Sequence, residues 1–313
     1  MAKRRSSTVR SQADAPNGAG GAATWPSLPY EEWRATRDTL HMYTQVVGKL
    51  RLALSPPEPQ WNHVPLYVTA RGLTTSSMRV GNRTLDAEFD LLGHELVVRR
   101  SDGLTERRPL GGAVADFYRD VMRMLSLMEV DVRISPKPQE VADPILFPED
   151  RVHDTYVHEH ATRFLETVAL VDAALKEHRA RFRGRTTPVQ FYWGTFDLAV
   201  IRYSGRAVQP PMDRGLIARV GGDAEAICAG WWPGDERVRY PAFYAYGYPA
   251  PDGVANSPVQ PEAAGWSATV GEFLMPYEAV RAGGDPRGAV LAFAESTYAA
   301  AARLMSWDQS LSG

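Results

Sequence analysis

The chain has 313 residues, enough to bury a core in one large or two modest domains. It is 44% hydrophobic and 23% charged with a formal net charge of -2, which excludes a globally basic nucleic-acid-binding surface. The single cysteine, Cys228, excludes an intramolecular disulfide and a zinc site built from cysteines. The use of a single cysteine also predicts a reducing, cytoplasmic location. Because no apolar run has the length of a membrane span and the net charge is not basic, we expect neither membrane nor nucleic acid as partner.

The first half of the chain predicts a tail, a helix and then an antiparallel meander. Residues 1–24 are polar and lack an apolar run after their basic start, which is typical of a disordered tail. Apolar residues at helical spacing, ended by prolines, predict the helix, and turn dipeptides separate the strands. The expected elements are a helix over 31–54, strands over 63–70, 83–91, 95–100 and 105–110, a helix over 116–128 and a strand over 130–134.

The second half follows a proline-rich, acidic stretch without periodicity, which predicts a linker or a long functional loop. The expected elements are a helix over 153–182, a strand pair within 189–203, a loop through 222, strands over 242–248 and 272–275, and a helix over 285–305. This order predicts an α+β fold of antiparallel sheets flanked by helices. Two related lobes are conceivable, with an N-terminal lobe over 25–135, a linker over 136–152 and a C-terminal lobe over 153–313.

A carboxylate among aromatic residues is the first candidate for chemistry. Asp197 lies in FYWGTFDLAVIRYSGR, where a buried strand would raise its pKa and suit it to proton transfer. The alternative is a structural ion pair between Asp197 and Arg202. Glu225 and Glu272 are carboxylates in similar surroundings, and a second aromatic run over 242–249 is typical of a pocket wall or a core.

A polar helix stripe and a polar strand face are candidates for an anion site. His41, Gln45 and Lys49 recur four apart on the first helix. In an extended strand, alternate residues from His63 to Arg71 would share one face. Lys49 and Arg71 would supply the positive charge of such a site. The alternative is a solvated sheet face beside an ordinary helix surface.

Other motifs indicate no metal or nucleotide. His153, His158 and His160 cluster around Glu159 but lack the spacing of a helical zinc motif, so we expect no metal. The chain contains no P-loop, no Rossmann glycine fingerprint and no nucleophile elbow. Cys228 lies in the apolar stretch AICAGWWPG, which is typical of a packed thiol.

Seven motifs together resemble a bacterial, mostly actinobacterial, family known only as a domain of unknown function. They are WPSLPYEEW, LHMYTQVVGKLRLALSP, HVPLYVTARGLTTS, FYWGTFDLAVIRYSGR, AGWWPG, PAFYAYGYP and GEFLMPYEAVR, and the resemblance covers residues 25–307. Typical members carry a histidine at the position of Gln190 and a His-Glu pair at the positions of Ala224 and Glu225. This chain keeps only Glu225, which puts a histidine- or metal-dependent activity in doubt.

Because it lacks these two histidines, the chain resembles a specialised branch of the family, the aziridine-forming enzymes of natural-product biosynthesis. These enzymes close a three-membered ring by expelling sulfate. That resemblance implies a cofactor-free reaction with a base and a sulfate-binding site. Asp197 or Glu225 would be the base. The residues that would hold the sulfate or shape the pocket are His41, Lys49, His63, Arg71, Arg202, Tyr244 and Tyr246.

Two other functions stay open at this point. One is a non-catalytic binding module for an anionic metabolite, and the other is a hydrolase that uses His41 or His63 with a carboxylate. We expect a small-molecule substrate in each case. Presentation of that substrate on a carrier protein and the need for a protein partner subunit are also left open.

Overall fold

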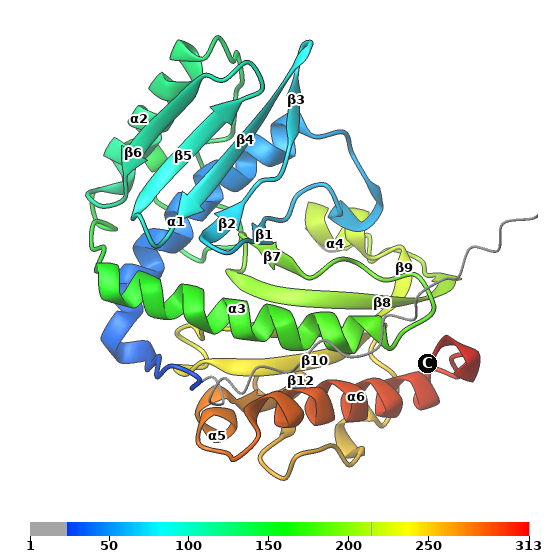
Figure 1. The fold of residues 1–313 in the computed structure, drawn as a ribbon. Helices are drawn as coiled ribbons and strands as arrows, with labels where there is room; N and C mark the ends of the chain where they lie inside the picture. The colour runs from blue at the N-terminus through cyan, green and yellow to red at the C-terminus, as the bar shows by residue number, and fades with distance from the viewer. Residues whose placement is uncertain (1–23, 214, 313) are drawn as a thin grey trace, which may run out of the picture.

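The computed structural model describes residues 24–213 and 215–312, so nearly all of the expected tail lies outside the described residues. Within these ranges the chain forms two six-stranded antiparallel sheets with helices packed on them, which confirms the α+β class (Figure 1). None of the described helices combines the length and the hydropathy that crossing a bilayer requires.

The N-terminal sheet is a meander with short strands at one edge. Its strand order is β1-β2-β4-β5-β6, and β3 pairs with β4. The elements of this part are α1 (Tyr30–Leu54), β1 (Tyr67–Val68), β2 (Gly72–Thr74), β3 (Met78–Val80), β4 (Arg83–Asp90), β5 (Glu95–Arg100), β6 (Thr105–Pro109) and α2 (Val114–Leu127). Helix α1 packs against α2 and β3, and its stripe of fully buried side chains includes Leu40 and Val47.

The C-terminal sheet has the strand order β11-β12-β10-β9-β8-β7. Its elements are β7 (Gln190–Tyr192), β8 (Asp197–Ala207), β9 (Ala224–Trp232), β10 (Ala242–Tyr248), β11 (Gly265–Ser267) and β12 (Glu272–Pro276). Two long helices, α3 (His158–Ala180) and α6 (Pro286–Leu304), run alongside β8 and β10 (Figure 1). Two shorter helices, α4 (Leu216–Gly221) and α5 (Tyr277–Arg281), follow β8 and β12.

The two sheets share one hydrophobic core. A backbone bridge joins Leu66 to Phe191 through two hydrogen bonds of 2.9 and 2.8 Å, so the first sheet is connected to strand β7 of the second. A single cluster of buried side chains includes Val98 of the first sheet, Phe164 of α3 and Phe243 of the second sheet. The helix α1 therefore lies against elements of both halves, including α3.

The structure corrects several expected elements. The strand expected over 63–70 is much shorter, because β1 comprises only Tyr67 and Val68, with Leu66 in a single bridge to Phe191 before it. Residues 130–134 form no strand. Helix α3 begins at His158 rather than at residue 153. Strand β9 was not predicted, since its alanine, cysteine and glycine residues are buried on both faces and show no alternation.

Candidate active site

One face of the C-terminal sheet carries polar and aromatic side chains from five strands. Alternation along β8 separates Asp197 from Arg202, and Arg202 contacts α3 and α6 on the opposite face. The registers align Tyr192 with Asp197, and Gly230 with Tyr244. We call the following set the acidic–aromatic face: Tyr192, Asp197, Cys228, Trp232, Tyr244, Tyr246 and Glu272.

Asp197 is the first residue of β8 and is 7% exposed. Its carboxylate accepts hydrogen bonds from the hydroxyls of Thr195 and Tyr244. Burial raises the pKa of Asp197 to about 6, and the two hydrogen bonds oppose that rise. The preceding residue, Phe196, has a φ of 60°, a left-handed conformation that is uncommon for an aromatic residue. The turn therefore holds this carboxylate in a specified position.

Gly230 makes the contact between Tyr244 and Asp197 possible. Strand β9 lies between the strands of these two residues, and Gly230 is directly opposite Tyr244. A Cβ at position 230 would lie 2.6 Å from the hydroxyl oxygen of Tyr244 and 2.7 Å from the carbonyl oxygen of Leu198. The tyrosine ring therefore crosses β9 over a position where a side chain would collide with it.

The aromatic side chains of this face form a row. The Trp232 and Tyr244 rings meet edge to face with centroids 6.1 Å apart, and the Tyr244 and Tyr246 rings are parallel with centroids 6.3 Å apart. Burial raises the pKa of the adjoining Cys228 thiol, which is 2% exposed. The thiol is packed, as expected, and remains protonated, so it is not an activated nucleophile.

Two further carboxylates lie near Asp197. Burial, and then the charge of Asp197, raise the pKa of Glu272 to about 7, while Arg237 opposes the rise. The same two causes raise the pKa of Glu140, which reaches the site from the loop between α2 and α3. Glu140 has a φ of 56°. In the described parts of the chain, neither Glu140 nor Glu272 makes a side-chain hydrogen bond or an ion pair.

The sequence analysis named Glu272 as a carboxylate in surroundings similar to those of Asp197 but did not include it among the site residues. It did not identify Glu140. The signal for Glu272 was its position at the start of an apolar strand, GEFLMP, which is the pattern that identified Asp197. The loop of Glu140 has no periodicity, and nothing in it indicates which sheet face it approaches.

The proposed pair of Asp197 and Arg202 is wrong. Arg202 is 1% exposed and lies on the other face, where it donates to the carbonyl of His178 and to Glu295 at 3.2 Å. Its guanidinium also lies 4.4 Å from the centroid of the Tyr298 ring. Five residues along a strand is an odd number, so opposite faces follow from alternation alone.

The other predicted residues are distributed over several places. Glu225 pairs with Arg206 at 2.6 Å, beyond the aromatic row along β9. Arg71 is half exposed and pairs with Asp90 of the N-terminal sheet at 2.7 Å. Lys49 is buried, and its ammonium lies over the ring of Trp193. In the described residues it has no carboxylate partner. Lys49 and Arg71 therefore have different neighbours, and the expected strand face that would have joined them does not form.

The two histidines predicted for the site, His41 and His63, form hydrogen bonds with different parts of the backbone. His41 is buried, its Nε2 lies 3.0 Å from the carbonyl oxygen of Gly194, and burial lowers its pKa to about 3. The Nδ1 of His63 accepts from the backbone N–H of Glu58 at 3.0 Å. In the residues that the structure describes, neither imidazole is hydrogen-bonded to a carboxylate. That arrangement does not favour a hydrolase that uses one of them.

A polar hollow of about 250 Å³ borders the acidic–aromatic face beside β7. Gln190 lines it and accepts a hydrogen bond of 2.9 Å from the hydroxyl of Tyr192. The other lining residues are Glu58, Asn62, Tyr67, Arg185, Thr186, Thr187, Pro188 and Tyr203. The hydrogen bond between Gln190 and Tyr192 therefore connects the wall of the hollow to the face that carries Asp197.

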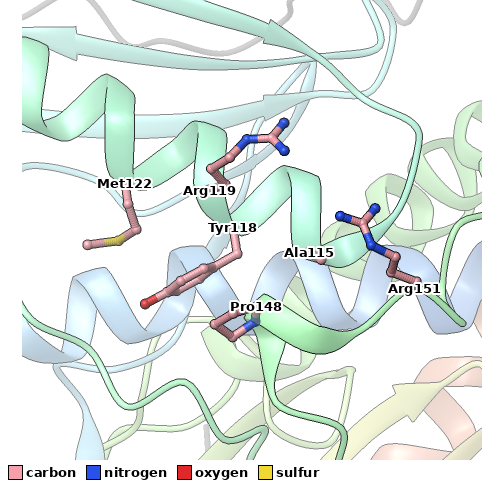
Figure 2. Close-up of a pocket in the computed structure, with 6 residues that line it drawn as sticks. All are labelled: Ala115, Tyr118, Arg119, Met122, Pro148 and Arg151. Carbon is pink, nitrogen blue, oxygen red and sulfur yellow. The ribbon is translucent and has the colours of Figure 1, made fainter.

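A second, more open hollow lies elsewhere on the surface, between α2 and the turn that contains Pro148 (Figure 2). Its two guanidinium groups, Arg119 and Arg151, both pair with Asp116 at 2.6 and 3.1 Å. Arg119 also pairs with Asp120 at 3.0 Å, so both guanidinium groups already have carboxylate partners.

The histidine cluster has partners of its own. His153 pairs with the fully buried Asp150 at 2.7 Å, and the ring of His158 stacks on His94 with centroids 3.9 Å apart. Across residues 24–213 and 215–312, no group of three or more histidine, cysteine, aspartate or glutamate side chains is placed to hold a metal ion.

The fold and this site define an α+β protein with a buried acidic site on one face of an antiparallel sheet. The chain belongs to a family of unknown function, DUF5996, whose model matches residues 25–312. The resemblance seen in the sequence motifs is therefore confirmed at the level of the family. Neither the curated proteins nor the solved structures contain a match to the chain.

Proposed function

We propose that this protein is an enzyme that binds a small amine at the acidic–aromatic face and removes a proton from it. The observation that carries this proposal is a group of three carboxylates, Asp197, Glu272 and Glu140, beside a row of aromatic rings. Burial raises the pKa of each of the three. None of the three forms an ion pair with a lysine or arginine in the described residues. An ammonium ion satisfies both features, because it attracts carboxylates and lies favourably over aromatic faces.

Glu272 is the best candidate for the base. Its pKa of about 7 lies near the pH at which most enzymes work, and its oxygens are not committed to hydrogen bonds in the described residues. Asp197 is held by Thr195 and Tyr244, which suits it to orient the ammonium rather than to exchange protons. A bound ammonium lowers the pKa of neighbouring carboxyls, so substrate binding ionises the base before the proton moves.

The finer proposal is ring closure in bacterial natural-product biosynthesis. Glu272 takes a proton from the ammonium, the freed nitrogen attacks a carbon within the same molecule, and an N–C bond forms. The C–O bond to the leaving group breaks, and sulfate departs with the bonding electron pair. The base and the positioning of the amine are supported by the acidic–aromatic face. The product is the protonated aziridine, which releases its proton to water, and no oxidant, reductant or cofactor is consumed.

The test uses 2-aminoethyl hydrogen sulfate, the smallest amine that carries such a leaving group. Purified protein is incubated with it, and free sulfate and aziridine are followed by ion chromatography and proton NMR. We expect catalysed sulfate release that falls by about 100-fold or more in Glu272→Gln, since general-base catalysis contributes about that much. The control is Glu278→Gln, which removes an exposed carboxylate paired with Arg281.

Binding of this amine without any turnover would favour the non-catalytic binding module over the enzyme. Amine binding is measured by calorimetry with ethanolamine and methylammonium. If neither amine binds, the proposal is wrong.

A further inference from the structure

Lys49 is a buried cation without an acidic partner. Its side chain belongs to α1 and the residue is 5% exposed. Over residues 24–213 and 215–312, its ammonium makes neither a hydrogen bond nor an ion pair, and its nitrogen is not among the polar atoms sealed from solvent. Burial lowers the pKa of Lys49. An unpaired ammonium in such a place gains free energy from any anion that reaches it.

The neighbouring polar groups on the same helix stripe are already used. The Gln45 amide donates to the carbonyl of Gln139 at 2.8 Å and accepts from its N–H at 2.7 Å. His41 is hydrogen-bonded to Gly194 and is neutral near pH 7, because burial lowers its pKa to about 3. Lys49 is therefore the member of this stripe with donors to offer a ligand.

The turn between β7 and β8 links Lys49 to the acidic–aromatic face. The Lys49 ammonium lies 5.8 Å from the centroid of the Trp193 ring, which packs on the backbone of Gly48. The next residue of the turn, Gly194, is close to Glu140, since a Cβ there would lie 2.5 Å from a Glu140 carboxylate oxygen. The turn then leads into Asp197. Lys49 thus contacts the first residue of this turn, Glu140 lies beside the second, and Asp197 follows the turn, and in the described residues none of the three pairs with another.

We infer that the substrate is a zwitterion whose anionic group, a carboxylate or a sulfate, binds the Lys49 ammonium while its amine binds at the acidic–aromatic face. This inference rests on the proposed function, because the amine end is the one proposed above. A zwitterion matches unpaired positive charge at Lys49 together with unpaired negative charge at the acidic–aromatic face. A simple amine would leave Lys49 unpaired.

The experiment compares probes that differ only in the anionic end. Ethanolamine, β-alanine and taurine, together with 2-aminoethyl hydrogen sulfate at low temperature, are titrated calorimetrically into the wild-type protein, Lys49→Met and Lys176→Met. Lys176 is the matched control because it is more than half exposed and pairs with Asp172. We expect zwitterions to bind the wild type at least about 10-fold more tightly than ethanolamine, which corresponds to one charge-assisted hydrogen bond.

In Lys49→Met this advantage should disappear while ethanolamine binds as before, and Lys176→Met should behave as the wild type. A preference for zwitterions that survives in Lys49→Met overturns the inference and leaves the proposed function standing. Absence of binding by every amine overturns both.

A second measurement does not depend on the folding of the variant. The sequence contains only four lysines, so the Lys49 side-chain resonances can be assigned in wild-type protein labelled with ¹³C-lysine. We expect β-alanine and taurine to shift the Lys49 ε-carbon resonance and ethanolamine to leave it in place. Equal shifts from all three probes would contradict a contact between Lys49 and the anionic group.

Discussion

Tyr244 donates its hydroxyl hydrogen to Asp197 across an intervening strand, and the two residues meet over Gly230. This contact joins the first carboxylate of the candidate site to the row of aromatic rings. The contact requires glycine at position 230, because any side chain there would collide with the Tyr244 ring. The relationship makes Gly230 a sensitive point at which the site can be disturbed without removing any of its functional groups.

Gly230→Ala should displace the Tyr244 ring, because the new Cβ would lie 2.6 Å from the Tyr244 hydroxyl oxygen. We expect a loss of about 1–3 kcal/mol in the free energy of unfolding, as for other overpacked sites, together with weaker amine binding. Chemical denaturation and calorimetry measure the two effects. Gly265→Ala is the control, since no atom lies within 4 Å of a Cβ built there. Equal behaviour of the two variants would show that the Tyr244 contact does not constrain the site.

The activity should depend on pH through Glu272. Because its pKa is about 7 and the base must be ionised, kcat/KM should rise as the pH increases through about 7 and then level off. Glu272→Gln should lose this limb together with most of the activity. The pH profile of sulfate release from 2-aminoethyl hydrogen sulfate is the measurement. A profile that is flat between about pH 5 and 9, an interval that brackets the raised pKa of Glu272, would rule out Glu272 as the base.

Asp197 should make the free protein less stable at neutral pH. Its pKa is raised from 3.8 to about 6 in the fold, so the folded state holds its proton more tightly than the unfolded state. The associated stability is fully present below pH 3.8 and is lost as the pH rises through about 6. Asp197→Asn should therefore unfold with a free energy up to about 3 kcal/mol higher than the wild type at pH 7.5.

The same variant separates two roles of Asp197. Near pH 3.5 its stability should approach that of the wild type, and amine binding should weaken at all pH values. Denaturant titrations at the two pH values are sufficient. Destabilisation of about 3–5 kcal/mol at pH 7.5, the cost of leaving a buried charge unpaired, would indicate instead that Asp197 neutralises a cation in the fold.

Glu295 should act in the opposite direction. Hydrogen bonds and charges from His178 and Arg202 overcome its burial and hold the pKa of Glu295 at about 2. The stability it contributes is present above its ordinary pKa of 4.5 and is lost as the pH falls toward 2. Glu295→Gln should cost about 3–5 kcal/mol at pH 7, because Arg202 is buried and loses its partner.

Thermal unfolding between pH 2 and 7 tests this expectation. The variant should show a smaller acid-induced loss than the wild type over that interval. Its amine binding at pH 7, measured where the variant is folded, should be unchanged, since Arg202 and Glu295 lie on the other face of the sheet. Reduced amine binding would show that the two faces are coupled.

Much of the secondary structure follows from local patterns. The helical stripe predicted α1 within one residue, and turn dipeptides predicted β4, β5 and β6. The α+β class follows from the order of these elements. Strand β9 escaped prediction because small buried residues carry no alternation, although this strand lies between β8 and β10 and supplies Gly230.

The sequence by itself determined that Asp197 stands among aromatics at the start of a buried strand, as the structure confirms. The alternative of a pair with Arg202 neglected the alternation of the strand, which puts the two residues on opposite faces. Only the tertiary structure decided what Asp197 meets. The register of β10 against β9 brings Tyr244 to it, and a loop without periodicity carries Glu140 close by. The physical reason is that alternation and helical spacing are local properties of the chain, whereas strand register and loop placement result from packing between distant segments.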